Sequence, residues 1–161
     1  MMAPAVLSVA VQTEDFSLED AFRRLRQAAP GAGAEVAFVG LVRDQAGSVA
    51  SLTLEHYPGM SERSMLAVCE RAAKRWPLQA VEAIHRVGTL GPGDQIVLVL
   101  VSSAHRHAAF AGAQYIMDAF QSEVVFWKLE DRGDEKVWIE ASPSDQRALS
   151  SWEQASEGGA P

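Results

Sequence analysis

The sequence predicts a single α+β domain, and three observations lead to that fold class. The chain has 161 residues, the usual size of one domain, and 48% of them are hydrophobic, enough for a substantial core. Apolar runs of strand character alternate with segments of helical periodicity. The run QIVLVLV, which follows a Gly-Pro-Gly turn, is typical of a buried central strand. We expect one domain over residues 1–154 and a disordered tail over residues 155–161.

The first third of the chain predicts a strand, a helix and a second strand. Val6–Val11 alternates weakly between apolar and polar residues, as strands do. Ser17 is a typical N-cap for a helix over Leu18–Gln27, and a PGAGA sequence ends that helix. Glu35–Val42 is apolar and β-prone, and Gly40 within it indicates a bulge or a close approach of another segment.

The middle third predicts another strand, a long helix and a strand. Val49–Tyr57 alternates as a strand and ends in a Pro-Gly turn. Ser61 is the expected N-cap of a helix that runs to about Trp76, where a proline stops it. Cys69 occupies an apolar position of this helix, so we expect it to be buried and unreactive. Val81–Val87 follows as a strand.

The last third contains the strand with the strongest pattern, Gln95–Val101. His107–Phe120 has its apolar residues on one face and predicts a helix. Val124–Glu130 and Lys136–Glu140 predict a strand pair around a polar loop. Asp145–Gln154 predicts a final helix.

Composition excludes several functional classes. The 14 Lys and Arg residues against 21 Asp and Glu residues give a net charge of −7, which repels phosphate backbones, so we expect no nucleic-acid partner. No apolar run approaches the roughly 20 residues that span a bilayer. The chain begins without basic residues before its first apolar stretch, so we expect no signal peptide, no membrane partner and a cytoplasmic protein. With a single cysteine, we expect no disulfide, no metal and no resident cofactor.

The polar residues alone indicate an anion site without naming a reaction. His105 and Arg106 follow the strongest strand and open a helix, a position that favours anions, although capping or surface roles fit them equally well. His105 and His107 have a metal-binding spacing, but no third ligand follows them in the sequence. Arg43 directly follows an apolar strand, where it either holds a phosphate or lies in a solvated loop.

Two further side chains fall inside predicted strands. Lys128 lies in the apolar segment VVFWKLE, where burial would lower the pKa of its amine toward useful nucleophilicity. The alternative is a lysine on an edge strand whose ammonium reaches solvent. His85 shares a strand face with Val81 and Val87, which favours a histidine of the core over a ligand.

Five segments taken together resemble one known family. They are GAEVAFVGLVRD (Gly33–Asp44), LTLEHYPGMSE (Leu52–Glu62), IHRVGTLGPGD (Ile84–Asp94), SSAHRHAAFAGAQYIMD (Ser102–Asp118) and FWKLE (Phe126–Glu130). In this order they are similar to the catalytic (large) subunit of molybdopterin synthase, the MoaE family. The resemblance extends from about Gly33 to Asp145 and covers most of the chain.

The resemblance implies a fold, partners and a reaction. The implied fold is an α+β hammerhead with an antiparallel or mixed sheet and packed helices, which forms a homodimer. Each large subunit would receive the C-terminal Gly-Gly tail of a small ubiquitin-like subunit, giving a heterotetramer. The tail carries a thiocarboxylate, and two sulfur transfers would convert cyclic pyranopterin monophosphate into the dithiolene of molybdopterin. An anionic substrate agrees with the anion site, and a sulfur that comes from the partner requires no reactive cysteine.

The resemblance also implies site residues. Arg43 matches the family's arginine after the first core strand, and His105 and Arg106 match its His-Arg pair, so these three are expected to bind substrate. Lys128 matches the lysine of the W-K-x-E motif and is expected at the sulfur-transfer centre. Together they are expected to form one locally cationic pocket.

Gln121 departs from the family pattern. It stands three residues after Asp118, where the family usually has a lysine that is thought to act in catalysis, and glutamine brings no positive charge and no nucleophilic amine. The leading hypothesis is an active sulfurtransferase in which Lys128 and Gln121 are catalytic residues. The alternative is a non-catalytic or weakened paralogue that still dimerises and binds the small subunit or a pterin. A third hypothesis, an acid–base hydrolase that uses His105, predicts no binding of such a subunit.

Overall fold

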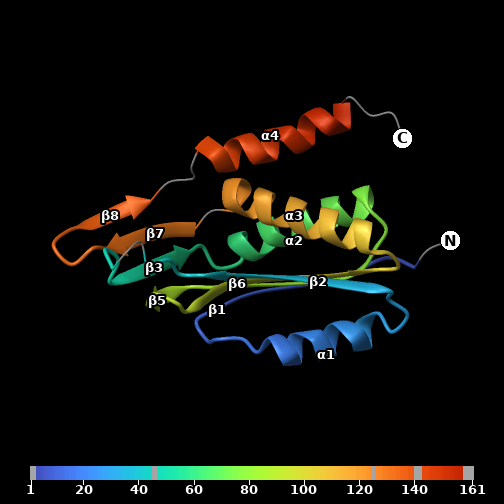
Figure 1. The fold of residues 1–161 in the computed structure, drawn as a ribbon, viewed down its shortest axis with the longest axis horizontal. Helices are drawn as coiled ribbons and strands as arrows, with labels where there is room; N and C mark the ends of the chain where they lie inside the picture. Colours follow the sequence, from blue (N-terminus) through green and yellow to red (C-terminus); the bar gives the residue numbers. More distant parts are fainter. Residues whose placement is uncertain (1–2, 45–46, 125, 140–142, 158–161) are drawn as a thin grey trace.

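A computed structural model describes residues 3–44, 47–124, 126–139 and 143–157. Four helices and eight strands follow one another along these residues, and Figure 1 shows their arrangement. In chain order they are β1 (Val6–Gln12), α1 (Leu18–Ala28), β2 (Ala34–Leu41), β3 (Ser51–His56), α2 (Met60–Arg75), β4 (Leu78–Arg86), β5 (Gly88–Leu90), β6 (Gln95–Ser103), α3 (Arg106–Glu123), β7 (Phe126–Asp131), β8 (Lys136–Ile139) and α4 (Pro143–Glu157). The predicted α+β class is confirmed.

The strands form two four-stranded sheets. The main sheet has the order β1-β4-β6-β2; β1 runs parallel to β4, and the other two pairs are antiparallel. The second sheet has the order β5-β3-β7-β8 and is antiparallel throughout. In the main sheet β6 is an interior strand, as its apolar sequence predicts, whereas β1 and β2 are its edges.

Helices cover both faces of the main sheet, as Figure 1 shows: α1 lies on one face, α2 and α3 lie on the other, and α4 lies outside α3. The alternation along β6 explains this layering. Val97, Val99 and Val101 belong to the core beneath α2 and α3, whereas Leu98 and Leu100 belong to the core beneath α1. Because both faces of this strand are buried, its sequence is a continuous apolar run.

Three details of the elements differ from the sequence prediction. The N-cap of α2 is Gly59 instead of Ser61, because a turn closed by Tyr57 starts the helix two residues earlier and the Glu62 carboxylate accepts the N–H of Gly59 at 2.6 Å. The strand β5 was not predicted, since three residues are too few to show a period. The helix α4 continues to Glu157, so three residues of the expected tail are helical, and residues 158–161 lie outside the described part of the chain.

Several predicted features of the core are present. The ladder between β2 and β6 shifts register between Gly40 and Leu41, and a Cβ on Gly40 would meet Val97 at 2.6 Å, so the predicted bulge and the close approach both occur there. Cys69 is fully buried, and burial raises the pKa of its thiol to about 12, so it is unreactive as expected. His85 is also buried, as a core histidine.

A pocket between the two sheets

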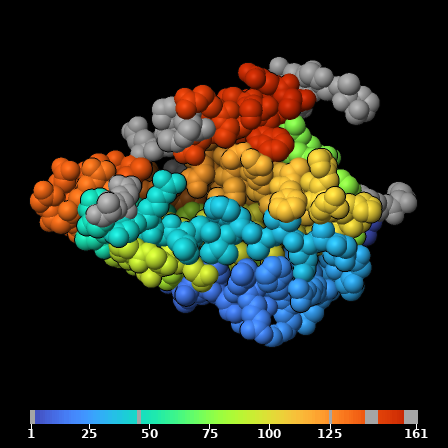
Figure 2. Space-filling view, viewed as in Figure 1, coloured from blue at the N-terminus to red at the C-terminus, as the bar shows by residue number. Residues whose placement is uncertain are grey.

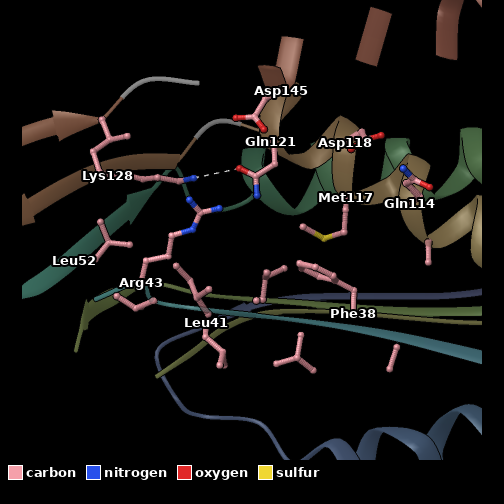
Figure 3. Close-up of a pocket in the computed structure, with 18 of the residues that line it drawn as sticks. Phe38, Leu41, Arg43, Leu52, Gln114, Met117, Asp118, Gln121, Lys128 and Asp145 are labelled. Atoms are coloured by element: carbon pink, nitrogen blue, oxygen red, sulfur yellow. Dashed lines mark hydrogen bonds between the residues drawn. The ribbon is translucent and has the colours of Figure 1, made fainter. Parts of the chain in front are cut away.

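A pocket lies where β2 and the loop after it meet α3 and the second sheet. Its volume is about 950 Å³. The wall along β2 is apolar and runs from Val36 to Val42, and Met117 and Phe110 of α3 face it. Figure 3 shows this pocket, with Phe38 and Leu41 below Met117.

Arg43, Gln121 and Lys128 meet at one end of the pocket. Arg43 comes from the loop after β2, Gln121 from the last turn of α3 and Lys128 from β7. The Lys128 ammonium donates to the amide oxygen of Gln121 at 3.5 Å, and Figure 3 shows the Arg43 guanidinium directed toward both. The site therefore joins three elements that are far apart in the sequence.

The amine of Lys128 is electrostatically unusual. Burial lowers its pKa below the ordinary lysine value, and the Asp145 carboxylate opposes this by favouring the ammonium form. Strand alternation explains the burial, because Lys128 points toward the pocket while its neighbour Trp127 is 45% exposed on the other face of the second sheet. The predicted half-buried amine is thus present.

A smaller pocket of about 350 Å³ lies behind this end and is lined by His85, Gln121 and Lys128. The His85 ring stacks on Phe126 with a centroid distance of 3.9 Å, and its Nδ1 lies 2.8 Å from the carbonyl oxygen of Arg86. Because a carbonyl oxygen only accepts, Nδ1 carries the proton and Nε2 is left as an acceptor. Burial is the largest cause that lowers the pKa of His85, to about 4, so the ring is neutral near pH 7.

Three acidic side chains also line the large pocket, and sequence reasoning missed them. Asp118 accepts the indole N–H of Trp152 at 2.6 Å, Glu130 accepts a hydrogen bond from Arg132 at 2.7 Å, and Asp145 lies in the first turn of α4. Asp118 and Glu130 end two of the segments that carry the family resemblance, which was the available signal. The described lining of one chain has two cations, Arg43 and Lys128, against these three carboxylates, so it is not the locally cationic pocket that was expected.

His105 and Arg106 are not part of this pocket within one chain. His105 is the N-cap of α3 and Arg106 its first residue, whereas Gln121 lies fifteen residues further along. At 1.5 Å per residue the two ends are roughly 22 Å apart. The expectation of one common cavity for Arg43, His105, Arg106 and Lys128 is therefore not met within one chain, because the His-Arg pair lies at the other end of α3. Neither His105 nor Arg106 lines either of the two pockets described above.

Two absences hold for the described ranges. No three His, Cys, Asp or Glu side chains there are grouped as a metal site would require. No helix among those residues is long and apolar enough to cross a membrane.

Comparisons with known proteins agree with one another. A family model described as MoaE protein matches residues 11–123. The molybdopterin synthase catalytic subunit of Vibrio cholerae is 50% identical over 147 residues, which are 90% of this chain and 97% of that protein. The molybdopterin synthase catalytic subunit of Mesorhizobium japonicum is 43% identical over 159 residues, which are 98% of this chain and 100% of that protein.

Solved structures give the same result. The molybdopterin biosynthesis MoaE protein from Burkholderia ambifaria superimposes with a TM-score of 0.81 at 41% identity, covering 92% of this chain and 99% of that one. The molybdopterin synthase structure from Staphylococcus aureus superimposes with a TM-score of 0.72 at 27% identity, covering 86% and 98%. The family model spans well over half of the chain, and the relatives match nearly all of it. This chain belongs to the MoaE family.

Proposed function

We propose that this protein is the large, catalytic subunit of a molybdopterin synthase. In this role it transfers sulfur from the thiocarboxylated C-terminus of a small ubiquitin-like subunit to cyclic pyranopterin monophosphate, forming the dithiolene of molybdopterin. The observation that carries the proposal is the meeting of Arg43, Gln121 and Lys128 at one end of a large pocket. The 50% identity to a protein named as this subunit supports it.

Each of the three pocket residues has a role that follows from its chemistry. Arg43 and Lys128 supply positive charge for the two anionic groups of the reaction, the thiocarboxylate of the tail and the phosphate of the pterin. Because burial lowers its pKa, Lys128 also gives up its proton more readily than an exposed lysine does. Gln121 holds the Lys128 ammonium through its amide oxygen, which leaves its NH₂ group as a donor to the substrate or the tail.

The proposal includes a homodimer that completes the site. β2 is an edge strand, and Phe38 and Leu41 on it are 43% and 54% exposed, an arrangement that favours pairing with another chain. If two β2 strands pair antiparallel across a two-fold axis near Phe38, the start of one lies beside the end of the other. Ala34 at that start is the ladder partner of Ser103, just before α3. His105 and Arg106 of one copy would then reach the Lys128 end of the other.

This arrangement would also make the pocket more positively charged. Within one chain its lining holds two cations and three carboxylates. The His-Arg pair of a second copy would add the missing positive charge for a phosphorylated substrate.

The reaction is tested by mixing the protein with the thiocarboxylated small subunit and cyclic pyranopterin monophosphate and measuring molybdopterin. The wild-type chain is expected to form product, and Lys128→Ala to lower the rate roughly 100-fold or more, since it removes a preorganised cation. Lys74→Ala, at an exposed position of α2, is the matched control and should retain the wild-type rate. A wild-type rate no higher than that of Lys128→Ala would contradict the proposal.

The shared site is tested by complementation. Arg106→Ala and Lys128→Ala are each expected to be inactive alone. An equal mixture, unfolded and refolded together, should recover about a quarter of the wild-type rate, because half of the dimers are mixed and each mixed dimer has one intact site. No recovery in dimers that light scattering shows to be formed would mean that each chain builds its site alone.

A further inference from the structure

The helix α4 contributes to the pocket although it lies outside α3 (Figure 1). Its first turn carries Asp145, which lines the pocket, and the hydroxyl of Ser122 on α3 donates to the backbone oxygen of Asp145 at 3.3 Å. Figure 3 shows Asp145, Gln121 and Lys128 around the same end of the pocket. The first turn of the C-terminal helix therefore borders the site through Asp145.

Trp152 makes several contacts between α4 and the helices beneath it. Its ring packs edge-on against Trp76 of α2 and Tyr115 of α3, with centroid distances of 5.4 and 5.9 Å. The Arg75 guanidinium lies 5.5 Å from the centre of the same ring. The indole N–H donates to Asp118 at 2.6 Å, so the same side chain also holds a pocket carboxylate. Trp152 thus attaches α4 to both helices beneath it.

The charges at this end of the pocket give Asp145 a specific role. Lys128 loses hydration by burial, which disfavours its ammonium form, and Asp145 is the carboxylate that opposes this effect. Glu130, on the same strand as Lys128, accepts a hydrogen bond from Arg132. Among the described residues that line the two pockets, the other titratable or charged groups are His85 of β4, Arg43 of the loop after β2 and Asp118 of α3.

We propose that Asp145 is a positioning residue for Lys128, that it sets how much of the amine is protonated in the pocket, and that Trp152 holds it there through α4. This inference rests on the proposed function, because it assigns the role through the reactive lysine. It makes the C-terminal helix a part of the catalytic unit, although none of the segments that carry the family resemblance lies in that helix.

The test reads the protonation of Lys128 directly. The chain has three lysines, Lys74, Lys128 and Lys136, so reductive ¹³C-methylation gives few resonances, which can be titrated by NMR in the intact protein. Asp145→Asn is expected to move the titration of Lys128 to lower pH and to leave Lys74 and Lys136 unchanged. Asp145→Glu should restore the wild-type titration. Glu153→Gln, which removes one exposed charge from the same helix, is the control.

The sign of the shift separates a positioning role from a merely structural one. If Asp145→Asn only loosened α4, Lys128 would gain hydration and titrate at higher pH. That result, or no shift at all, would overturn the proposal.

The role of Trp152 is tested by a double-mutant cycle. If Trp152 holds Asp145 in place, Asp145→Asn should have little further effect on the Lys128 titration in a Trp152→Ala background. An undiminished effect would overturn that part of the inference. The Lys128 titration and the double-mutant cycle are both measured without substrate. A synthase assay in which Lys128→Ala keeps full activity would instead refute the proposed function and leave the charge coupling intact.

Discussion

At position 121 an amide occupies the place where the family resemblance predicts a lysine. The structure shows what the amide does there: its oxygen accepts from Lys128 and its NH₂ group remains available as a donor. A neutral partner that holds the neighbouring amine is compatible with an active site. A lysine at this position would instead put a third positive charge beside Arg43 and Lys128.

The Gln121→Lys variant decides between an active enzyme and a weakened paralogue. We expect it to form molybdopterin within about tenfold of the wild-type rate, because Lys128 and Arg43 already supply the charge for the reaction. The assay with the thiocarboxylated small subunit measures this. A wild-type chain with almost no activity and a Gln121→Lys rate roughly 100-fold higher would favour the paralogue. A gain of that size is the typical effect of a preorganised cation.

The lowered pKa of His85 predicts that the stability of the protein depends on pH. Its pKa falls from 6.5 to about 4 on folding, so the unfolded chain binds a proton between these values and the folded chain does not. The free energy of unfolding therefore decreases by about 3 kcal/mol as the pH falls from 6.5 to 4, and this contribution is constant outside that window. In urea unfolding at pH 7 and pH 4.5, His85→Gln should lose less stability than the wild type. His107→Gln, which changes an exposed histidine, should follow the wild type.

Residue type and strand period were sufficient to predict Lys128 as a half-buried amine and His85 as a core histidine. They were not sufficient to place His105 and Arg106, which were expected in one pocket with Lys128 although neither lines that pocket within one chain. The signal was available, since a helix predicted over His107–Phe120 already separates its ends by roughly 20 Å. The pairing with a second copy, which we propose would bring the two residues to the pocket, has no pattern in the sequence of one chain.

Among the elements, the junction of β2 and α3 is the most constrained. Gly33 donates its N–H to Ser103, and a Cβ on Gly33 would lie 2.1 Å from the backbone oxygen of Ala104, which cannot move aside as a flexible side chain can. This contact fixes the start of α3, and hence His105 and Arg106, relative to the edge strand.

Gly33→Ala should therefore destabilise the protein, by about 2 kcal/mol or more, through forced backbone movement. Gly31→Ala is the matched control, because nothing lies within 4 Å of its Cβ position, and its effect should stay within about 0.5 kcal/mol. Chemical denaturation measures both. Equal effects of the two variants would show that the chain relaxes around Gly33 without cost.

Long elements with a clear period could be predicted, and short or capped ones could not. β6 and α3 are recognisable from their apolar patterns, whereas β5 is set only by its pairing with β3. The start of α2 was misplaced because Ser61 is a typical N-cap residue, while the turn before it favours Gly59, whose φ of 82° suits glycine. Tertiary contacts also place α4, whose anchor Trp152 binds groups on two other helices.

For the whole molecule, the division of eight strands into two sheets did not follow from the sequence, because strand patterns do not identify partners. The space-filling view in Figure 2 shows α4 lying on α3 on one side of the molecule and α1 on the opposite side. Most of the pocket wall along β2 is apolar, and three of its side chains, Phe38, Leu41 and Phe110, are exposed in one chain. Such exposure favours a partner on this edge.

Phe38→Lys tests the homodimer. A charge in the middle of the free β2 edge should convert dimers into monomers, measured by light scattering after gel filtration, and should abolish synthase activity with them. Val6→Lys, an exposed residue of the opposite edge strand β1, is the matched control and should remain dimeric. Monomers that keep full activity would contradict a site shared between two copies.

The parallel pairing of β1 with β4 has a consequence for biosynthesis. Val6–Gln12 is made before its partner Leu78–Arg86, which follows roughly 70 residues later. At translation rates of roughly 5–20 residues per second, the nascent β1 waits several seconds with its backbone groups unpaired. The pairing of β1 is therefore non-local, and folding of the main sheet is expected to be slower than if β1 paired with a neighbour in the chain.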